Sequence, residues 1–151
     1  MKFTVKKLNQ FLLLKLPSAY FTGVRVELLE KNKAVVKVKH RWINQNPFNS
    51  LYYGVQAMAA ELATGILVMR AVSEAGKPIS MLVTQQTASF TKKGKGIVRF
   101  TCANGVEIDK AIEATLKTGA GQIINLEAQG LNEKGEQVSL FHFEWSVRVK
   151  H

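Results

Sequence analysis

Alternating polar and apolar residues predict most of the strands in this chain. Within residues 34–40, apolar Val36 and Val38 alternate with lysines, which is the period of two expected of a strand with one buried face. Residues 23–29 are rich in β-branched and apolar side chains, and the polar stretch 30–33 between the two segments indicates a hairpin. Four further strands are predicted at residues 79–90, 96–103, 122–131 and 137–150.

One long segment is apolar on all sides. From Leu51 to Met69 almost every residue is apolar or small, which predicts a helix that continues to about Glu74 before a Gly-Lys-Pro sequence ends it. We reject a membrane-spanning helix because Glu61 lies at its centre, where a carboxylate costs about 2.5–3.5 kcal/mol. A helix of this kind belongs in the middle of a fold.

Two shorter helices complete the predicted elements. Residues 1–16 form an amphipathic helix that Pro17 ends, and residues 107–117 place apolar side chains at helical spacing. A curved antiparallel sheet wrapped around the long helix would bury that helix. The sequence therefore predicts a single α+β domain over residues 1–151, with the helix at 107–117 inserted between strands.

Composition narrows the class of protein. Hydrophobic residues make up 46% and charged residues 21% of the 151 positions, which excludes disorder as the main state. The single cysteine, Cys102, excludes an internal disulfide and a cysteine-rich zinc site. We expect Cys102 to be a small buried residue rather than a nucleophile, no bound metal, and a cytoplasmic location, since no targeting segment is evident.

The chain is strongly basic, with 21 Lys and Arg against 11 Asp and Glu and a net charge of +10. This charge indicates anionic partners: nucleic acid, an anionic membrane face, a phosphate-bearing cofactor or an acidic protein. Nucleic acid ranks last, because lysine dominates and no arginines alternate with aromatic residues. A basic, solvated surface without a partner remains an alternative.

Glu61 is the first candidate for chemistry, because it is the only charged residue between Leu51 and Met69. A carboxylate in an apolar helix is costly unless it is paired or used. Desolvation would raise its pKa toward the range of a general base. The alternative is a structural glutamate that reaches solvent or a backbone donor, and the residues alone leave both open.

The start of the long helix gives two more candidates. The amide of Asn46 could orient a water or a carbonyl, although Asn-Pro in a loop is usually turn chemistry. At Tyr52, Tyr53 and Gly54, free N–H groups of a helix start could stabilise a developing oxyanion, and glycine would let a ligand approach. A plain helix start with packed tyrosines explains the same residues.

A basic segment between two predicted strands forms the last candidate. Lys92, Lys93 and Lys95 could bind phosphates, or they could form a charged hairpin turn, which is the commoner case. The sequence contains no HExxH, GxSxG, GxxxxGKS or GxGxxG pattern.

Residues 46–61, Asn-Pro-Phe-Asn-Ser-Leu-Tyr-Tyr-Gly-Val-Gln-Ala-Met-Ala-Ala-Glu, resemble the signature of PaaI-like hotdog-fold thioesterases. There an Asn or Gln precedes a His-Gly-Gly by six positions, and an Asp or Glu follows the His by nine. Asn46, Tyr52 and Glu61 match this spacing without a gap. Residues 90–96, Phe-Thr-Lys-Lys-Gly-Lys-Gly, also resemble the family's turn after the third strand. The order of strands and helices agrees over most of the chain.

The resemblance implies a hotdog fold and a thioesterase mechanism. It implies a homodimer, or a dimer of dimers, with each site at the subunit interface. Glu61 would be the general base or the nucleophile, the amide N–H of Tyr53 or Gly54 would bind the oxyanion, and Asn46 would position the water or the thioester carbonyl. No cofactor would be required, and coenzyme A would enter as part of the substrate. Its phosphates would meet Lys92, Lys93 and Lys95.

Two residues depart from the family pattern. Tyr52 replaces the His and Tyr53 the first Gly, so the chain resembles a branch in which the His-Gly-Gly is degenerate. We expect a thioesterase that hydrolyses an acyl-CoA or acyl-carrier-protein thioester. The alternative is a hotdog module that binds acyl-CoA or another apolar ligand without catalysis. The sequence does not define the acyl chain, the choice between coenzyme A and carrier protein, or dimer against tetramer.

Overall fold

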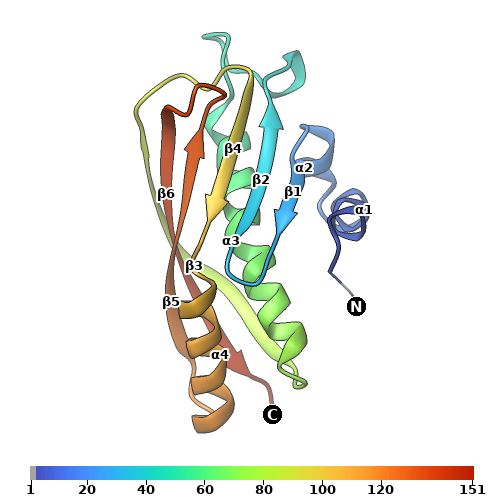
Figure 1. Ribbon diagram of the computed structural model, residues 1–151, viewed down its shortest axis with the longest axis vertical. Helices are drawn as coiled ribbons and strands as arrows, with labels where there is room; N and C mark the ends of the chain where they lie inside the picture. The colour runs from blue at the N-terminus through green and yellow to red at the C-terminus, as the bar shows by residue number, and fades with distance from the viewer. Residues whose placement is uncertain (1–2) are drawn as a thin grey trace.

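The structure, a computed structural model, describes residues 3–151 (Figure 1). Positions 1 and 2 of the predicted N-terminal helix lie outside the described residues. The helices are α1 (Val5–Lys15), α2 (Pro17–Phe21), α3 (Tyr53–Glu74) and α4 (Gly105–Thr118), with a short 3-10 helix η1 (Trp42–Asn44). The strands are β1 (Arg25–Leu29), β2 (Ala34–Lys39), β3 (Ile79–Phe90), β4 (Ile97–Cys102), β5 (Gln122–Leu131) and β6 (Gln137–Val149).

The six strands form one antiparallel sheet in the order β1-β2-β4-β5-β6-β3. The predicted hairpin of β1 with β2 is confirmed. The basic segment 91–95 joins β3 to β4 but is not a hairpin turn, so that interpretation is wrong. Because β3 pairs with β6 at the sheet edge, this segment crosses the ends of β6 and β5 before β4 begins between β2 and β5.

Helix α3 lies along one face of the sheet (Figure 1). Strand β5 shows the alternation that this layer requires, since Ile124, Leu126 and Ala128 are buried and the residues between them are exposed. By length and composition α3 could also cross a membrane, but 72% of its apolar window is buried inside the fold. The predicted α+β class, with a curved antiparallel sheet around one apolar helix, is confirmed.

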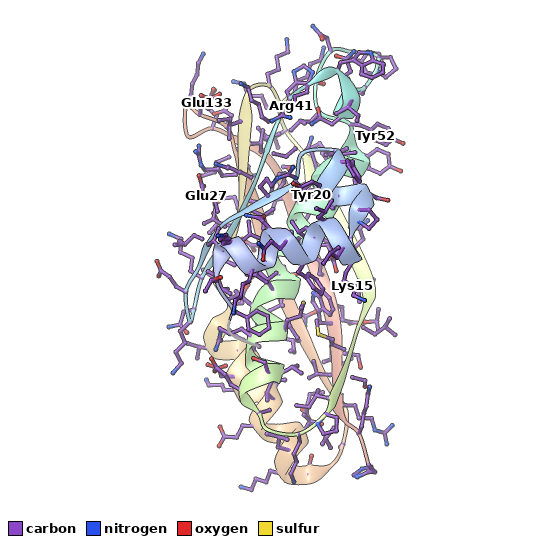
Figure 2. All side chains as sticks on the ribbon, turned by 90° about the vertical axis from the view of Figure 1, so that its right-hand side faces the viewer. Lys15, Tyr20, Glu27, Arg41, Tyr52 and Glu133 are labelled. Atoms are coloured by element: carbon purple, nitrogen blue, oxygen red, sulfur yellow. The ribbon has the colours of Figure 1, made fainter. Side chains whose placement is uncertain are left out.

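The predicted N-terminal helix corresponds to α1, and a second, unpredicted helix follows it. Helix α1 ends at Lys15, and after Leu16 a second helix, α2, begins at Pro17. Proline suits the first position of a helix because its φ is already helical and its missing N–H has no acceptor there. Leu8 and Leu12 of α1 are buried, and α1 contacts β1. Figure 2 shows α1 in front of the sheet with Lys15 at its end.

Gly105, the first residue of α4, is buried against the turn between β1 and β2. A Cβ at this position would lie 2.4 Å from the Cα of Asn32 and 2.6 Å from the carbonyl oxygen of Lys31. Backbone atoms must move to relieve these contacts, so we expect Gly105→Ala to cost about 1–3 kcal/mol of unfolding free energy. Thermal unfolding measures it. Gly121→Ala is the control, because its Cβ would approach nothing closer than 3.8 Å, and equal stability of both variants would contradict the prediction.

Strand β3 is an uncovered edge over its second half. Every residue from Thr84 to Phe90 is exposed, although alternate side chains point to opposite faces of the sheet. Earlier in the strand, Met81 and Val83 are half-buried. No residue of β3 carries a charge, and charge is one of the usual means of blocking an edge against another strand. This edge is therefore suited to pairing.

Candidate functional site

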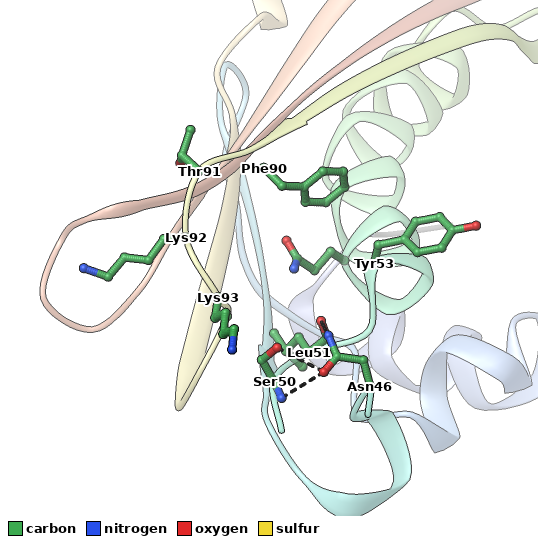
Figure 3. Close-up of a pocket in the computed structure, with 10 residues that line it drawn as sticks. Asn46, Ser50, Leu51, Tyr53, Phe90, Thr91, Lys92 and Lys93 are labelled. Carbon is green, nitrogen blue, oxygen red and sulfur yellow. Dashed lines mark hydrogen bonds between the residues drawn. The ribbon is translucent and has the colours of Figure 1, made fainter. Parts of the chain in front are cut away.

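A pocket of about 420 Å³ opens at the N-terminal end of α3 (Figure 3). Its walls come from the loop before α3, the first turn of α3, the end of β3 and the basic segment that follows. The lining residues include Asn46, Tyr53, Gln56, Phe90, Lys92 and Lys93. Predicted site residues from two separate parts of the chain, 46–53 and 92–93, thus meet at one pocket, whereas Glu61, Gly54 and Lys95 do not line it.

Asn46 organises the loop that leads into α3. Its Oδ1 accepts hydrogen bonds from the N–H of Phe48 at 3.0 Å and from the N–H and Oγ of Ser50 at 3.2 and 3.1 Å, as Figure 3 shows for Ser50. Its Nδ2 donates to the carbonyl of Leu51 at 3.2 Å. The carbonyl end of the amide is thus fully occupied by the loop, and only the second N–H of Nδ2 is left for a ligand.

The first turn of α3 has no side-chain cap. Tyr52 precedes the helix without capping it, and within residues 3–151 the N–H groups of Tyr53 and Gly54 meet no acceptor. Such unsatisfied amides carry the positive end of the helix dipole and attract negative charge. The ring of Tyr52 covers Gly54, because a Cβ on that glycine would lie 2.9 Å from Tyr52 Cε2. The Tyr52 ring therefore shields the Cα of Gly54 on that side.

Gln56 is a residue of this pocket that the sequence analysis missed. It lies one turn after Tyr53, is only 4% exposed, and its Oε1 accepts a hydrogen bond of 2.7 Å from Oγ of Ser139 on β6. The sequence does contain a signal for this residue, because Gln56 is an uncharged polar side chain within the apolar segment 51–69. Glu61 is more conspicuous in the same segment because it is charged.

Glu61 lies in the wall of a second pocket, of about 220 Å³, between α3 and the α1–α2 corner. Burial raises the pKa of its carboxyl above the ordinary value of 4.5, and within residues 3–151 no side-chain or backbone donor binds that carboxylate. Lys15 also lines this pocket. Eight residues of helix separate Glu61 from Tyr53, which is about 12 Å. One copy of the chain therefore does not bring the two together.

A buried network fixes the helical turn that carries Glu61. Thr64 Oγ1 donates to the carbonyl of Glu61 at 2.8 Å and accepts from Trp145 Nε1 at 2.9 Å. A Cβ at Gly65 would lie 3.4 Å from the indole of Trp145 and 3.7 Å from Glu61 Oε1. The carboxylate and the indole thus flank Gly65, where a larger residue would crowd both.

The three lysines have different surroundings. Lys92 forms an ion pair with Glu136, whose pKa is lowered mainly by this hydrogen bond. Lys93 lines the pocket, and its Nζ lies 5.9 Å from the ring centroid of Phe48. Lys95 does not line the pocket; it lines a neighbouring surface hollow with Glu133, and Lys92 and Lys93 border that hollow as well. Lys93 is thus the member of this group best placed to meet an anion at the pocket.

Cys102 has the character of a core residue. It is fully buried, and desolvation raises the pKa of its thiol to about 11, so the reactive thiolate is scarce at neutral pH. The prediction of a small buried residue is confirmed. Over residues 3–151, no group of three or more His, Cys, Asp or Glu is arranged to hold a metal ion.

Several solved structures share this fold. PA5026 from Pseudomonas aeruginosa, a protein of unknown function described as "Probable Thioesterase", matches with a TM-score of 0.81 and 22% identity over 99% of each chain. OLEI01261 from Chlorobaculum tepidum TLS matches with a TM-score of 0.83 and 20% identity over 97% of this chain and 94% of that one. The thioesterase HI1161 from Haemophilus influenzae matches at 0.76 and 15% identity, over 99% and 93%. At these identities the likeness is one of fold.

Comparison by sequence finds a single family and no curated relative. No curated protein matches the sequence. The model of one family, described as the domain of unknown function DUF4442, matches residues 6–147. This range runs from α1 to near the end of β6, so it includes both pockets. The antiparallel sheet around α3 is the hotdog fold that the resemblance implied, and the chain belongs to the DUF4442 family.

Proposed function

We propose that the protein is a thioesterase that hydrolyses an acyl-CoA or acyl-carrier-protein thioester. The observation that carries the proposal is the pairing of two features on one helix. Helix α3 begins with unsatisfied amide N–H groups at a pocket, and further along it holds a carboxylate whose pKa is raised by burial. These are the parts that ester-type hydrolysis needs: a donor for an oxyanion and a base for water.

The proposed reaction places the thioester carbonyl at the start of α3. The carboxylate of Glu61 takes a proton from water while the water oxygen bonds to the carbonyl carbon, and the carbonyl electron pair moves onto its oxygen. The N–H of Tyr53 or Gly54 stabilises that oxyanion. When the oxyanion collapses, the C–S bond breaks, its electron pair leaves with sulfur, and the proton held by Glu61 passes to the thiolate. In the nucleophilic variant, the Glu61 carboxylate attacks the carbonyl carbon, the C–S bond breaks, and the thiolate leaves with the electron pair. Water then hydrolyses the mixed anhydride, which releases the acid, returns the Glu61 carboxylate and supplies the proton that the thiolate takes up.

A second copy of the chain is part of the proposal. In one copy, Glu61 and the start of α3 face different pockets. The exposed, uncharged edge of β3 offers a surface on which two copies can pair antiparallel around a two-fold axis. Glu61 of one copy would then serve the α3 N-terminus of the other, in keeping with the interface sites that the hotdog resemblance implies.

The basic segment would hold the phosphates of coenzyme A. Lys93 lies at the pocket and Lys95 beside it, and neither forms an ion pair within residues 3–151. Lys92 contributes less, because Glu136 already neutralises it. Charge at this end of the pocket favours a ligand with an anionic headgroup.

The second candidate function is binding without catalysis. Its specific support is the ring of Tyr52 over Gly54, which closes one approach to the helix start, together with the exposed ring of Tyr53 at the pocket. A module of this kind would bind acyl-CoA saturably and release no thiol.

Thiol release from butyryl-, octanoyl- and palmitoyl-CoA between pH 4 and pH 9 tests the thioesterase. We expect hydrolysis whose kcat/KM rises with pH, because Glu61 acts as a base only when ionised. The midpoint of that rise is expected above 4.5, since burial raises the pKa of this carboxyl. Saturable binding of all three without thiol release at any pH would favour the binding module instead.

A further inference from the structure

The pocket at the start of α3 contains a buried amide whose two ends have different surroundings. Gln56 is 4% exposed and lines the pocket. Its Oε1 accepts the hydrogen bond from Ser139 Oγ at 2.7 Å, between two side chains that are buried. That bond ties the first turn of α3 to β6 and fixes the orientation of the amide plane. Because the serine occupies Oε1, Nε2 is the end of the amide that is left to bind a ligand.

Nε2 of Gln56 has no acceptor within residues 3–151. This nitrogen nevertheless keeps some contact with solvent. Because Gln56 lines the pocket, we take that contact to be with the pocket space. An amide nitrogen has two N–H donors, and buried donors are nearly always satisfied in native proteins. A purely structural Ser–Gln pair explains the position of Oε1 but leaves this donor facing the pocket without use.

The position of Gln56 on the helix matches that of the free backbone amides. Tyr53 and Gln56 are three residues apart and so lie on the same side of α3, and both line the pocket. The N–H of Tyr53 is unsatisfied. The N–H of Tyr53 points out of the N-terminal end of the helix, and the side chain of Gln56 leans toward the same end, as helical side chains do. A backbone donor and a side-chain donor therefore border one pocket, an arrangement suited to a carbonyl oxygen that gains negative charge.

We infer that Gln56 is an additional catalytic residue, whose Nε2 donates a hydrogen bond to the carbonyl oxygen of the bound acyl group beside the Tyr53 amide. Ser139 is a positioning residue, because its hydroxyl holds Oε1 and so turns Nε2 toward the pocket. This inference rests on the proposed function for the identity of the ligand. It adds a neutral donor to the site, so it requires no change of protonation during the reaction.

Two stable ligands separate carbonyl recognition from general binding. The first is octanoyl-dethia-CoA, a ketone in which a methylene replaces the thioester sulfur. The second is the same molecule with a further methylene in place of the carbonyl. Their affinities are measured by calorimetry for the wild type, Gln56→Met, Ser139→Ala and the control Gln10→Met. Methionine keeps the length of glutamine without a donor, and Gln10 is exposed on α1, away from the pocket.

We expect the wild type and Gln10→Met to prefer the ketone by about threefold to tenfold. Gln56→Met is expected to lose most of this preference by weakening only the ketone, because only the Tyr53 amide then remains as a donor, and Ser139→Ala is expected to reduce it. In turnover of octanoyl-CoA, Gln56→Met should lower kcat by about 10²–10³-fold with a small change in KM. A merely structural role would weaken both ligands equally, so it would not change the ratio.

The failures of the two proposals are distinguishable. Retention of the ketone preference in Gln56→Met, or equal weakening of both ligands, overturns the role of Gln56 even where the wild type hydrolyses octanoyl-CoA. Ketone preference lost in Gln56→Met supports the role even where the wild type does not turn over. Binding of neither ligand, without hydrolysis of any acyl-CoA, overturns the proposed function and the inference together.

Discussion

Glu61→Gln is expected to abolish hydrolysis while making the protein more stable at neutral pH. Glutamine keeps the shape of the side chain but cannot take a proton from water, so kcat/KM should fall by about 10²–10⁴-fold. The stability gain has a separate cause. Burial disfavours the ionised carboxylate, which has no hydrogen-bond donor among residues 3–151, so a neutral amide removes that cost.

The pH dependence of this stability gain follows from the direction of the pKa shift. A raised pKa means that the folded protein holds a proton on Glu61 over a pH range in which the unfolded chain has released it. Wild-type stability therefore falls as pH rises from the ordinary value of 4.5 through the raised pKa. The difference in Tm between Glu61→Gln and the wild type should be absent below this range and greatest above it.

Glu113→Gln provides the matched control, because Glu113 is exposed on α4 and has no ion pair within residues 3–151. It should change neither thiol release nor the pH dependence of Tm. Hydrolysis that survives Glu61→Gln would remove this residue from the mechanism. A lower Tm at neutral pH would show that the carboxylate is bound by a donor that the single chain lacks.

The second large effect is expected at the edge of β3. Lysines at positions 85 and 87, in the variant Gln85→Lys/Thr87→Lys, would bring like charges together where two copies pair around a two-fold axis. We expect the wild type to sediment as a dimer or larger assembly and this variant as a monomer. Hydrolysis should disappear with the assembly, because each site would lose its Glu61 from the neighbouring copy.

Ala103→Lys/Ala120→Lys adds the same charge at exposed loop positions and should keep both assembly and activity. Mixing two inactive variants gives a sharper test. Glu61→Gln and Gln56→Met, unfolded and refolded together, should recover about a quarter of wild-type activity, since half of the random dimers carry one intact site. A monomeric wild type that hydrolyses thioesters would contradict the shared site, as would a mixture that stays inactive.

The strands and helices were predictable because each has a clear period along the chain. The alternation in β2 and β5 and the apolar run of α3 are local patterns, and burial on one face produces them directly. The neighbour of β3 was not predictable in this way. Its partner is β6, which is distant in the sequence, and no local pattern in β3 identifies that partner. The basic segment 91–95 also has the composition of a hairpin turn, although it crosses two strand ends.

In the candidate site, too, proximity within one segment was predictable and contacts between distant segments were not. Asn46 and Tyr53 lie within one short segment, so their proximity at the pocket follows from local spacing. Gln56 was missed because its partner, Ser139, is 83 residues away, and only that contact distinguishes a donor aimed at the pocket from an ordinary polar residue. The distance of Glu61 from Tyr53 follows from the length of the predicted helix. The pocket that Glu61 lines depends instead on the α1–α2 corner, a tertiary contact that no local pattern shows.

The two tryptophans of the chain lie in opposite environments. Trp42 in η1 is 82% exposed, whereas Trp145 is 4% exposed and its indole lies beside the same glycine as the Glu61 carboxylate. Replacing Trp42 by phenylalanine would leave a single emitting indole in the interior, next to that carboxylate. The fold thereby carries its own optical probe, and fluorescence from Trp145 can follow events at Glu61 in real time without an attached dye.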